Sequence, residues 1–120
     1  MATFDTDILR TLRDLDEVAI RSRQHPKTTV VIWAVVVDGA LFVRSARGAA
    51  GRWFRDVTAE PRATLEFAGR RLAVEAVRVT DPRSMERVSD EYLRKYRNSS
   101  YVRSVLRPDV LSTTLRLDPL

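Results

Sequence analysis

The chain of 120 residues contains no cysteine, one histidine (His25) and only two lysines, Lys27 and Lys95. The lack of cysteine excludes disulfide bonds, thiolate metal ligands and a thiol nucleophile. A single histidine excludes any site that needs two imidazoles, and no acidic cluster has the spacing of metal ligands. We therefore expect no metal centre. His25 lies in a predicted turn, and nothing in the sequence places a nucleophilic side chain beside it. We therefore interpret His25 as a surface residue.

Long hydrophobic runs are also missing. The longest apolar run, Val30 to Val37, has eight residues, whereas a membrane-spanning helix needs about 20. The first residues do not show the basic region followed by an apolar stretch that is typical of a secretory signal. Neither a phosphate-binding Walker loop nor a dinucleotide fingerprint is present. These absences predict a cytoplasmic protein that does not act at a membrane.

Positive charge is present but unusual in its make-up, with 19 arginines against two lysines and a net charge of +5. Such an excess indicates a polyanionic partner, a small anionic ligand, or a coding sequence that favours arginine. Most arginines are dispersed and have acidic neighbours, and no nucleic-acid-binding motif accompanies them. Coding bias therefore explains the ratio best, and a nucleic-acid partner is not expected. A smaller group gathers near two turns and favours a small anionic ligand: Arg21, Arg23, Arg44, Arg47 and Arg52.

Hydrophobic periodicity predicts one domain over residues 1–120. The predicted elements are an N-terminal helix within 1–15, barrel strands within 17–79 interrupted by a short helix at 52–57, helices within 82–106, and a last strand at 112–117. The β-branched segment 28–37 predicts a central strand buried on both faces, with Trp33 in the core. Asp38-Gly39 predicts a tight hairpin, and Gly69-Arg70 a second one.

Six predicted strands with hairpins, and no alternation of strands and helices, favour an antiparallel sheet. In so short a chain an open sheet would leave long unpaired edges. The sequence therefore predicts a mainly β (α+β) fold, a closed six-stranded antiparallel β-barrel with flanking helices.

One segment, 43–55, has the composition of an anion site. A strand ends in Arg44-Ser45, small residues follow, and a helix begins after Gly51. Backbone N–H groups in such a loop and helix start converge, with the positive helix dipole behind them. The guanidinium groups of Arg44, Arg47 and Arg52 suit a phosphate, and Trp53 suits a planar ring. The alternative is a surface loop with solvated arginines and Trp53 in the core.

The turn before the strand at 28–37 is a second candidate. It offers Arg23, Lys27, Thr28 and Thr29 as donors to an anion. The alternative is an ordinary basic surface turn. Together the two segments give nine candidate cofactor-binding residues: Lys27, Thr28, Thr29, Arg44, Ser45, Arg47, Gly51, Arg52 and Trp53.

Five stretches carry a family resemblance: Val-Ile-Trp-Ala-Val at 31–35, Asp-Gly-Ala-Leu-Phe-Val-Arg-Ser at 38–45, the glycine loop through Arg-Trp-Phe-Arg at 48–55, Tyr-Leu-Arg-Lys-Tyr at 92–96, and Ser-Thr-Thr-Leu-Arg-Leu at 112–117. The chain resembles the pyridoxamine 5'-phosphate oxidase-like split β-barrels, especially the branch of deazaflavin-dependent nitroreductases and quinone reductases. It is more closely similar to a small family of unknown function near that branch.

The resemblance implies a split barrel of the FMN-binding type that forms a homodimer. FMN or a deazaflavin would lie in a groove at the subunit interface. It also implies that Lys27, Thr28 and Thr29 help to hold the cofactor phosphate, and that Ser45 and Trp53 match positions of the family's cofactor loop.

The leading hypothesis is a flavin- or deazaflavin-dependent oxidoreductase that transfers hydride to an unknown small molecule. The cofactor would carry the chemistry, so no side-chain acid or base is required, and we assign no catalytic residue. The alternatives are a non-catalytic flavin or haem carrier or sensor on the same fold, and a protein that has lost its cofactor.

Overall fold

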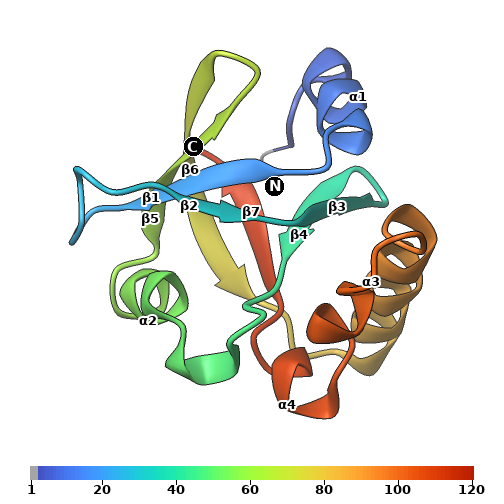
Figure 1. Cartoon of the computed structure of the whole chain (residues 1–120). Helices are drawn as coiled ribbons and strands as arrows, with labels where there is room; N and C mark the ends of the chain where they lie inside the picture. The colour runs from blue at the N-terminus through green and yellow to red at the C-terminus, as the bar shows by residue number, and fades with distance from the viewer. Residues whose placement is uncertain (1–2) are drawn as a thin grey trace.

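Seven strands form one antiparallel sheet in the order β2-β1-β5-β6-β7-β4-β3 in the computed structural model, which describes residues 3–120. The strands are β1 Val18–Ser22, β2 Val30–Ile32, β3 Ala34–Val37, β4 Ala40–Val43, β5 Arg62–Phe67, β6 Arg70–Arg78 and β7 Leu115–Pro119. The two strands at the ends of this order, β2 and β3, are consecutive in the chain and separated only by Trp33. The sheet therefore closes into a barrel through one bent segment (Figure 1). Counted as one, that segment gives the six predicted strands.

The prediction of a single central strand over 28–37 is wrong. β2 pairs with β1, with Val18 opposite Ile32, whereas β3 pairs with β4, with Ala34 opposite Val43. The two halves of the segment thus belong to opposite ends of the sheet order. Its outward side is uncovered near the bend, because 59% of the surface of Val31 is exposed. Burial on both faces holds only for β3, where Ala34 and Val36 belong to the barrel interior and Val35 to the second part of the core, whereas β2 is uncovered on one side.

The helices lie outside the barrel (Figure 1). They are α1 Thr6–Asp14, α2 Arg52–Ala59, α3 Pro82–Lys95 and α4 Pro108–Leu111, with single 3-10 turns η1 at Gly48–Ala50 and η2 at Val102–Val105. α3 begins where predicted, because the carboxylate of Asp81 accepts a 2.9 Å hydrogen bond from the Ser84 N–H. α2 is two residues longer than predicted. The expectation of a strand from residue 112 is wrong, because α4 and a turn occupy the chain up to Thr114.

Both predicted hairpins are present. Asp38 and Gly39 have φ angles of 51° and 76°, and Ala68 and Gly69 have φ angles of 48° and 75°. Two consecutive residues of positive φ are typical of the type I′ turn, whose twist matches that of the flanking strands. The second turn lies one residue earlier than Gly69-Arg70, so an alanine has to adopt the left-handed conformation.

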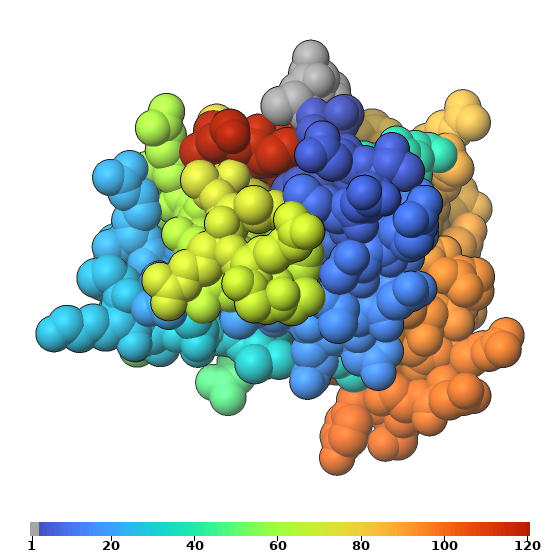
Figure 2. Space-filling model, turned by 90° about the horizontal axis from the view of Figure 1, so that it is seen from above, coloured from blue at the N-terminus to red at the C-terminus, as the bar shows by residue number. Residues whose placement is uncertain are grey.

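The hydrophobic core has two parts. The barrel interior is filled by side chains from every strand and by α1, among them Leu12, Ile20, Leu41, Leu65 and Leu117. Burying each such side chain stabilises the fold by about 1.5–3 kcal/mol. Figure 2 shows the N-terminal segment (blue) and the β5–β6 turn (yellow-green) over one end of the barrel.

The second part of the core lies between the barrel wall and α3. Val35 and Phe42 face outward from the sheet and pack there with Val88 and Tyr92. α3 is therefore fixed against the β3–β4 side of the barrel. Among residues 3–120, no helix is long and apolar enough to cross a membrane.

Candidate functional site

A cavity of about 660 Å³ opens where β2 bends away from the end of β4. β2 and Trp33 form one wall, the loop after β4 and the start of α2 form the opposite wall, and η2 contributes Ser104 and Val105. The volume falls within the range of small-molecule sites in proteins, roughly 300–1,000 Å³. Six of the nine predicted site residues line this cavity: Arg44, Ser45, Arg47, Gly51, Arg52 and Trp53.

Arg44 is a structural side chain as well as part of the cavity wall. It is only 2% exposed. Its guanidinium group donates to Thr114 Oγ1 at 2.8 Å, to Ser89 Oγ and the Val105 carbonyl at 2.9 Å each, and to the Met85 carbonyl at 3.0 Å. It thereby joins the end of β4 to α3, to η2 and to the chain before β7. Burial lowers the pKa of Arg44, and the nearby Tyr92 partly opposes this. All its described partners are neutral, so a net positive charge is buried beside the cavity.

Ser45 and Gly51 shape the loop that begins α2. The Ser45 hydroxyl donates to the Gly48 carbonyl at 2.7 Å, and its N–H donates to Thr113 Oγ1 at 3.0 Å. A Cβ atom on Gly51 would overlap Ser45 Oγ. Glycine is needed here for close packing, since its φ of −59° is open to any residue. The two residues therefore hold the shape of the cavity wall through contacts within the loop.

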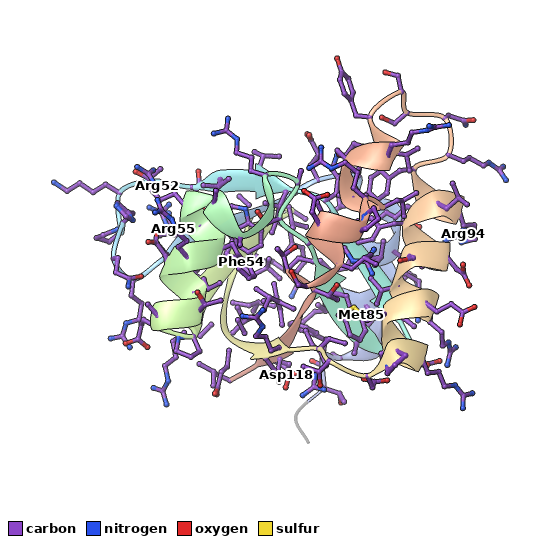
Figure 3. The ribbon with its side chains drawn as sticks, turned by 90° about the horizontal axis from the view of Figure 1, so that it is seen from below. Arg52, Phe54, Arg55, Met85, Arg94 and Asp118 are labelled. Carbon is purple, nitrogen blue, oxygen red and sulfur yellow. The ribbon has the colours of Figure 1, made fainter. Side chains whose placement is uncertain are left out.

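Arg47 and Arg52 are the free cations of the cavity wall. Both side chains are exposed, and within residues 3–120 neither forms an ion pair. Arg52 is the first residue of α2, where backbone N–H groups lack helical partners and the helix dipole is positive. Figure 3 shows Phe54 pointing from α2 toward the barrel while Arg52 and Arg55 lie on its outer side. This end of the cavity is built to attract an anion.

Both tryptophans line the cavity, although the sequence predicts Trp33 in the core. Trp53 is 8% exposed and packs edge-on against Phe54, with ring centroids 6.2 Å apart. Trp33, predicted in the core, is half-buried at the bend and lines the cavity. Its ring stacks on Tyr96 at a centroid distance of 4.2 Å and an interplanar angle of 4°. Trp33 thus gives the cavity an aromatic wall that is held by stacking on Tyr96.

Lys27, Thr28 and Thr29 are exposed and do not line the cavity. They lie in the turn between β1 and β2, which extends beyond it. The arrangement of this turn was not visible in the sequence, because it depends on a residue of α2. Asp56 Oδ2 lies 2.6 Å from His25 Nδ1 and accepts a 2.8 Å hydrogen bond from Ser22 Oγ. The basic turn is therefore fastened to the same helix that supplies Arg52.

Asp56 is ionised in this setting. Burial raises its pKa, but the hydrogen bonds from Ser22 and His25 and the charges of His25 and Arg52 outweigh that effect. The pKa of Asp56 therefore lies below its ordinary value. Sequence reasoning missed Asp56, since no local pattern links a helical aspartate to a turn some 30 residues earlier in the chain.

Sequence reasoning also missed Glu17, which lies just before β1 and lines the cavity beside Trp33. It begins the segment predicted to form the first barrel strand, and no local pattern indicates that the bend of β2 places a cavity beside it. Among the described residues that line the cavity it is the single acidic side chain.

Solved structures similar to this chain define its fold class. HutZ, the haem storage protein from Vibrio cholerae, is 11% identical with a TM-score of 0.64, over 98% of this chain and 91% of that one. An F420-H2 dependent reductase is 14% identical with a TM-score of 0.63, over 86% and 94% of the two chains. A putative pyridoxamine 5'-phosphate oxidase from Listeria innocua is 13% identical with a TM-score of 0.61, over 95% and 90%. The fold is that of the pyridoxamine 5'-phosphate oxidase-like split barrels, as the resemblance implied.

The particular family follows from the sequence match. The family model described as "Uncharacterized protein conserved in bacteria (DUF2255)" matches residues 8–117, and the chain belongs to that family. The comparison with curated proteins finds no match. The predicted relationship to a small family of unknown function near the flavin and deazaflavin split barrels is confirmed.

Proposed function

We propose that the cavity holds a flavin or deazaflavin cofactor and that the protein is an oxidoreductase acting on a small molecule. The observation that carries the proposal is that one cavity of suitable size combines an aromatic wall at Trp33 with the guanidinium groups of Arg47 and Arg52, which form no ion pair within residues 3–120. The anionic group of the ligand binds to the two guanidinium groups, and its planar ring lies against Trp33. The similar reductase and oxidase show the same fold at low identity, which supports the proposal without assigning the cofactor.

The roles of the chain's own residues follow from their positions. Arg47, Arg52 and the first N–H groups of α2 bind the phosphate. Trp33 orients the ring, and the apolar side chains of β2 exclude water from its edge. A bound flavin or deazaflavin supplies the hydride chemistry itself. This division of labour fits a cavity whose described lining holds no histidine and no paired carboxylates.

The turn residues Lys27, Thr28 and Thr29 have a secondary place in this proposal. Because they lie outside the cavity, they contact only a part of the ligand that extends past the end of β2. We assign the first phosphate contacts to Arg47 and Arg52. Ser45, Gly51 and Arg44 support those contacts by fixing the wall, and Trp53 anchors α2 in the core.

Haem is the second candidate, because HutZ shares the fold. It is less well supported by the geometry. The single histidine, His25, is bonded to Asp56 and does not line the cavity. A haem placed there would lack an imidazole ligand from the described residues.

We further propose that the protein works as a homodimer. The cavity is open at the bend, and the exposed apolar side chain of Val31 stands beside it. One similar solved structure is described as a domain-swapped dimer. A second copy over this face would bury Val31 and enclose the ligand. Light scattering with and without Val31→Glu tests this, with loss of the dimer in the variant as the expected result.

A visible-absorbance titration with FMN, a deazaflavin and haemin tests the cofactor. We expect saturable binding of FMN or the deazaflavin, weakened about ten-fold or more by Arg47→Ala with Arg52→Ala. The matched control is Arg83→Ala, an exposed arginine on α3 outside the cavity, which should leave the affinity unchanged. Binding of haemin alone would replace the flavin proposal, and absence of binding to all three would refute it.

A further inference from the structure

The carboxylate of Glu17 is an acidic group in a cavity lined otherwise by cations and neutral side chains. Its side chain is exposed to the cavity, and within residues 3–120 it forms no hydrogen bond and no ion pair. The other charged groups of the lining, Arg44, Arg47 and Arg52, are all cations. A lone acidic group weakens the attraction of this cavity for an anion. A ligand that places a hydrogen-bond donor beside the Glu17 carboxylate would suit this position.

The register of the sheet places Glu17 at the aromatic wall. Val18 pairs with Ile32, so the preceding residue, Glu17, flanks Trp33. Burial raises the pKa of Tyr96, and the negative charges of Asp16 and Glu17 raise it further, so the Glu17 carboxylate is within electrostatic reach of the Trp33–Tyr96 stack. The Tyr96 hydroxyl is already engaged, since it donates to the Asp16 carbonyl at 2.6 Å. The carboxylate is therefore free beside the ring stack.

The cations of the lining come from other elements than Glu17, since Arg44 and Arg47 follow β4 and Arg52 begins α2. Along β1, Glu17 precedes Ser22 by five residues, about 16 Å in an extended strand. Ser22 contacts Asp56 of α2, and Arg52 lies about 6 Å from Asp56, one helical turn away. Glu17 and Arg52 thus lie on different parts of the cavity wall. The described lining combines an acceptor-only group, an aromatic ring and donor-only groups.

We propose that Glu17 determines the specificity of this site by accepting a hydrogen bond from an N–H group on the edge of a planar heterocycle that lies against Trp33. The inference rests on the proposed function and narrows its ligand class. The ligand is a phosphate-bearing ring system with an imide or lactam N–H, as in the pyrimidinedione portion of flavins and deazaflavins. A ring edge that carries only acceptors is disfavoured, because it would leave the carboxylate desolvated and unpaired.

The test compares FMN with FMN methylated at the ring imide nitrogen, which keeps the phosphate and the ring but has no N–H at that edge. The wild-type protein should bind FMN about ten-fold or more tightly than the methylated form. Glu17→Ala should remove most of this preference, mainly by weakening FMN. Glu17→Gln, which keeps an acceptor oxygen, should retain part of it. Glu75→Ala, an exposed carboxylate on β6 outside the cavity, is the matched control.

The outcomes separate this inference from the proposed function. Arg47→Ala should weaken both ligands by the same factor and keep their ratio. A wild-type protein that binds both ligands equally, or a ratio unchanged in Glu17→Ala, would overturn the role of Glu17 while leaving flavin binding intact. Failure of both ligands to bind would overturn the proposed function and the inference together. Far-ultraviolet circular dichroism of each variant checks that it is folded.

Discussion

Asp56 on α2 and His25 in the β1–β2 turn are joined by a 2.6 Å contact between Oδ2 and Nδ1. The same carboxylate oxygen accepts the Ser22 hydroxyl at 2.8 Å. β2, which continues from this turn, forms one wall of the cavity, and the start of α2 forms part of the other. The single side chain of Asp56 therefore connects the two walls of the cavity.

Asp56→Asn should loosen the cavity and destabilise the fold. The amide keeps an acceptor oxygen but loses the charge that favours both hydrogen bonds, so we expect a loss of about 1–2 kcal/mol in the free energy of unfolding. Urea unfolding measures it. Asp90→Asn, an aspartate on α3 far along the chain and without an ion pair among the described residues, is the control. Equal stability of Asp56→Asn and wild type would show that the contact is not a clamp.

The contribution of Asp56 should depend on pH. Its pKa in the folded protein lies below the value in the unfolded chain, which is about 3.9. The folded state therefore favours the ionised carboxylate. The resulting stability is fully present above the unfolded pKa and is lost as the pH falls through the folded pKa. The difference in unfolding free energy between wild type and Asp56→Asn should shrink below about pH 4. A difference that grows as the pH falls would contradict this sign.

Arg44→Met should be among the most destabilising single substitutions in the protein. It leaves Thr114, Ser89 and the carbonyl groups of Val105 and Met85 without their donor, which predicts a loss of about 3 kcal/mol or more. Arg44→Lys should recover little, because an ammonium group cannot reproduce the planar arrangement of donors. Urea unfolding with Arg83→Ala as control provides the measurement. A loss below about 1 kcal/mol would show that water replaces the guanidinium group.

Local chemistry explains which parts of the fold could be predicted. Asp38-Gly39 and Asp81-Pro82 act through the backbone of their own neighbours, so the hairpin and the start of α3 were visible in the sequence. The bend at Trp33 was not, because nothing in an apolar run records which strands its two halves pair with. That one bend brings Glu17 and Trp33 to the cavity, which is why they were missed as site residues. The role of Asp56 was hidden for the same reason, since its partners are distant in the chain.

Gly51 and Ser45 provide a prediction in which two substitutions offset each other. Gly51→Ala places a methyl group on the buried Ser45 Oγ, and we expect a loss of about 1–3 kcal/mol in unfolding free energy together with weaker FMN binding. Ser45→Ala alone removes the hydrogen bond to the Gly48 carbonyl and should cost about 1 kcal/mol in unfolding free energy.

In the double variant the obstructing oxygen of Ser45 is absent, and the next neighbour of the new methyl group, the Gly48 carbonyl oxygen, lies at 3.4 Å. The double variant should therefore be more stable than Gly51→Ala, with a coupling energy of about 1 kcal/mol between the two positions. Strictly additive losses would show that the loop yields in another direction and that Ser45 does not set the position of the α2 start.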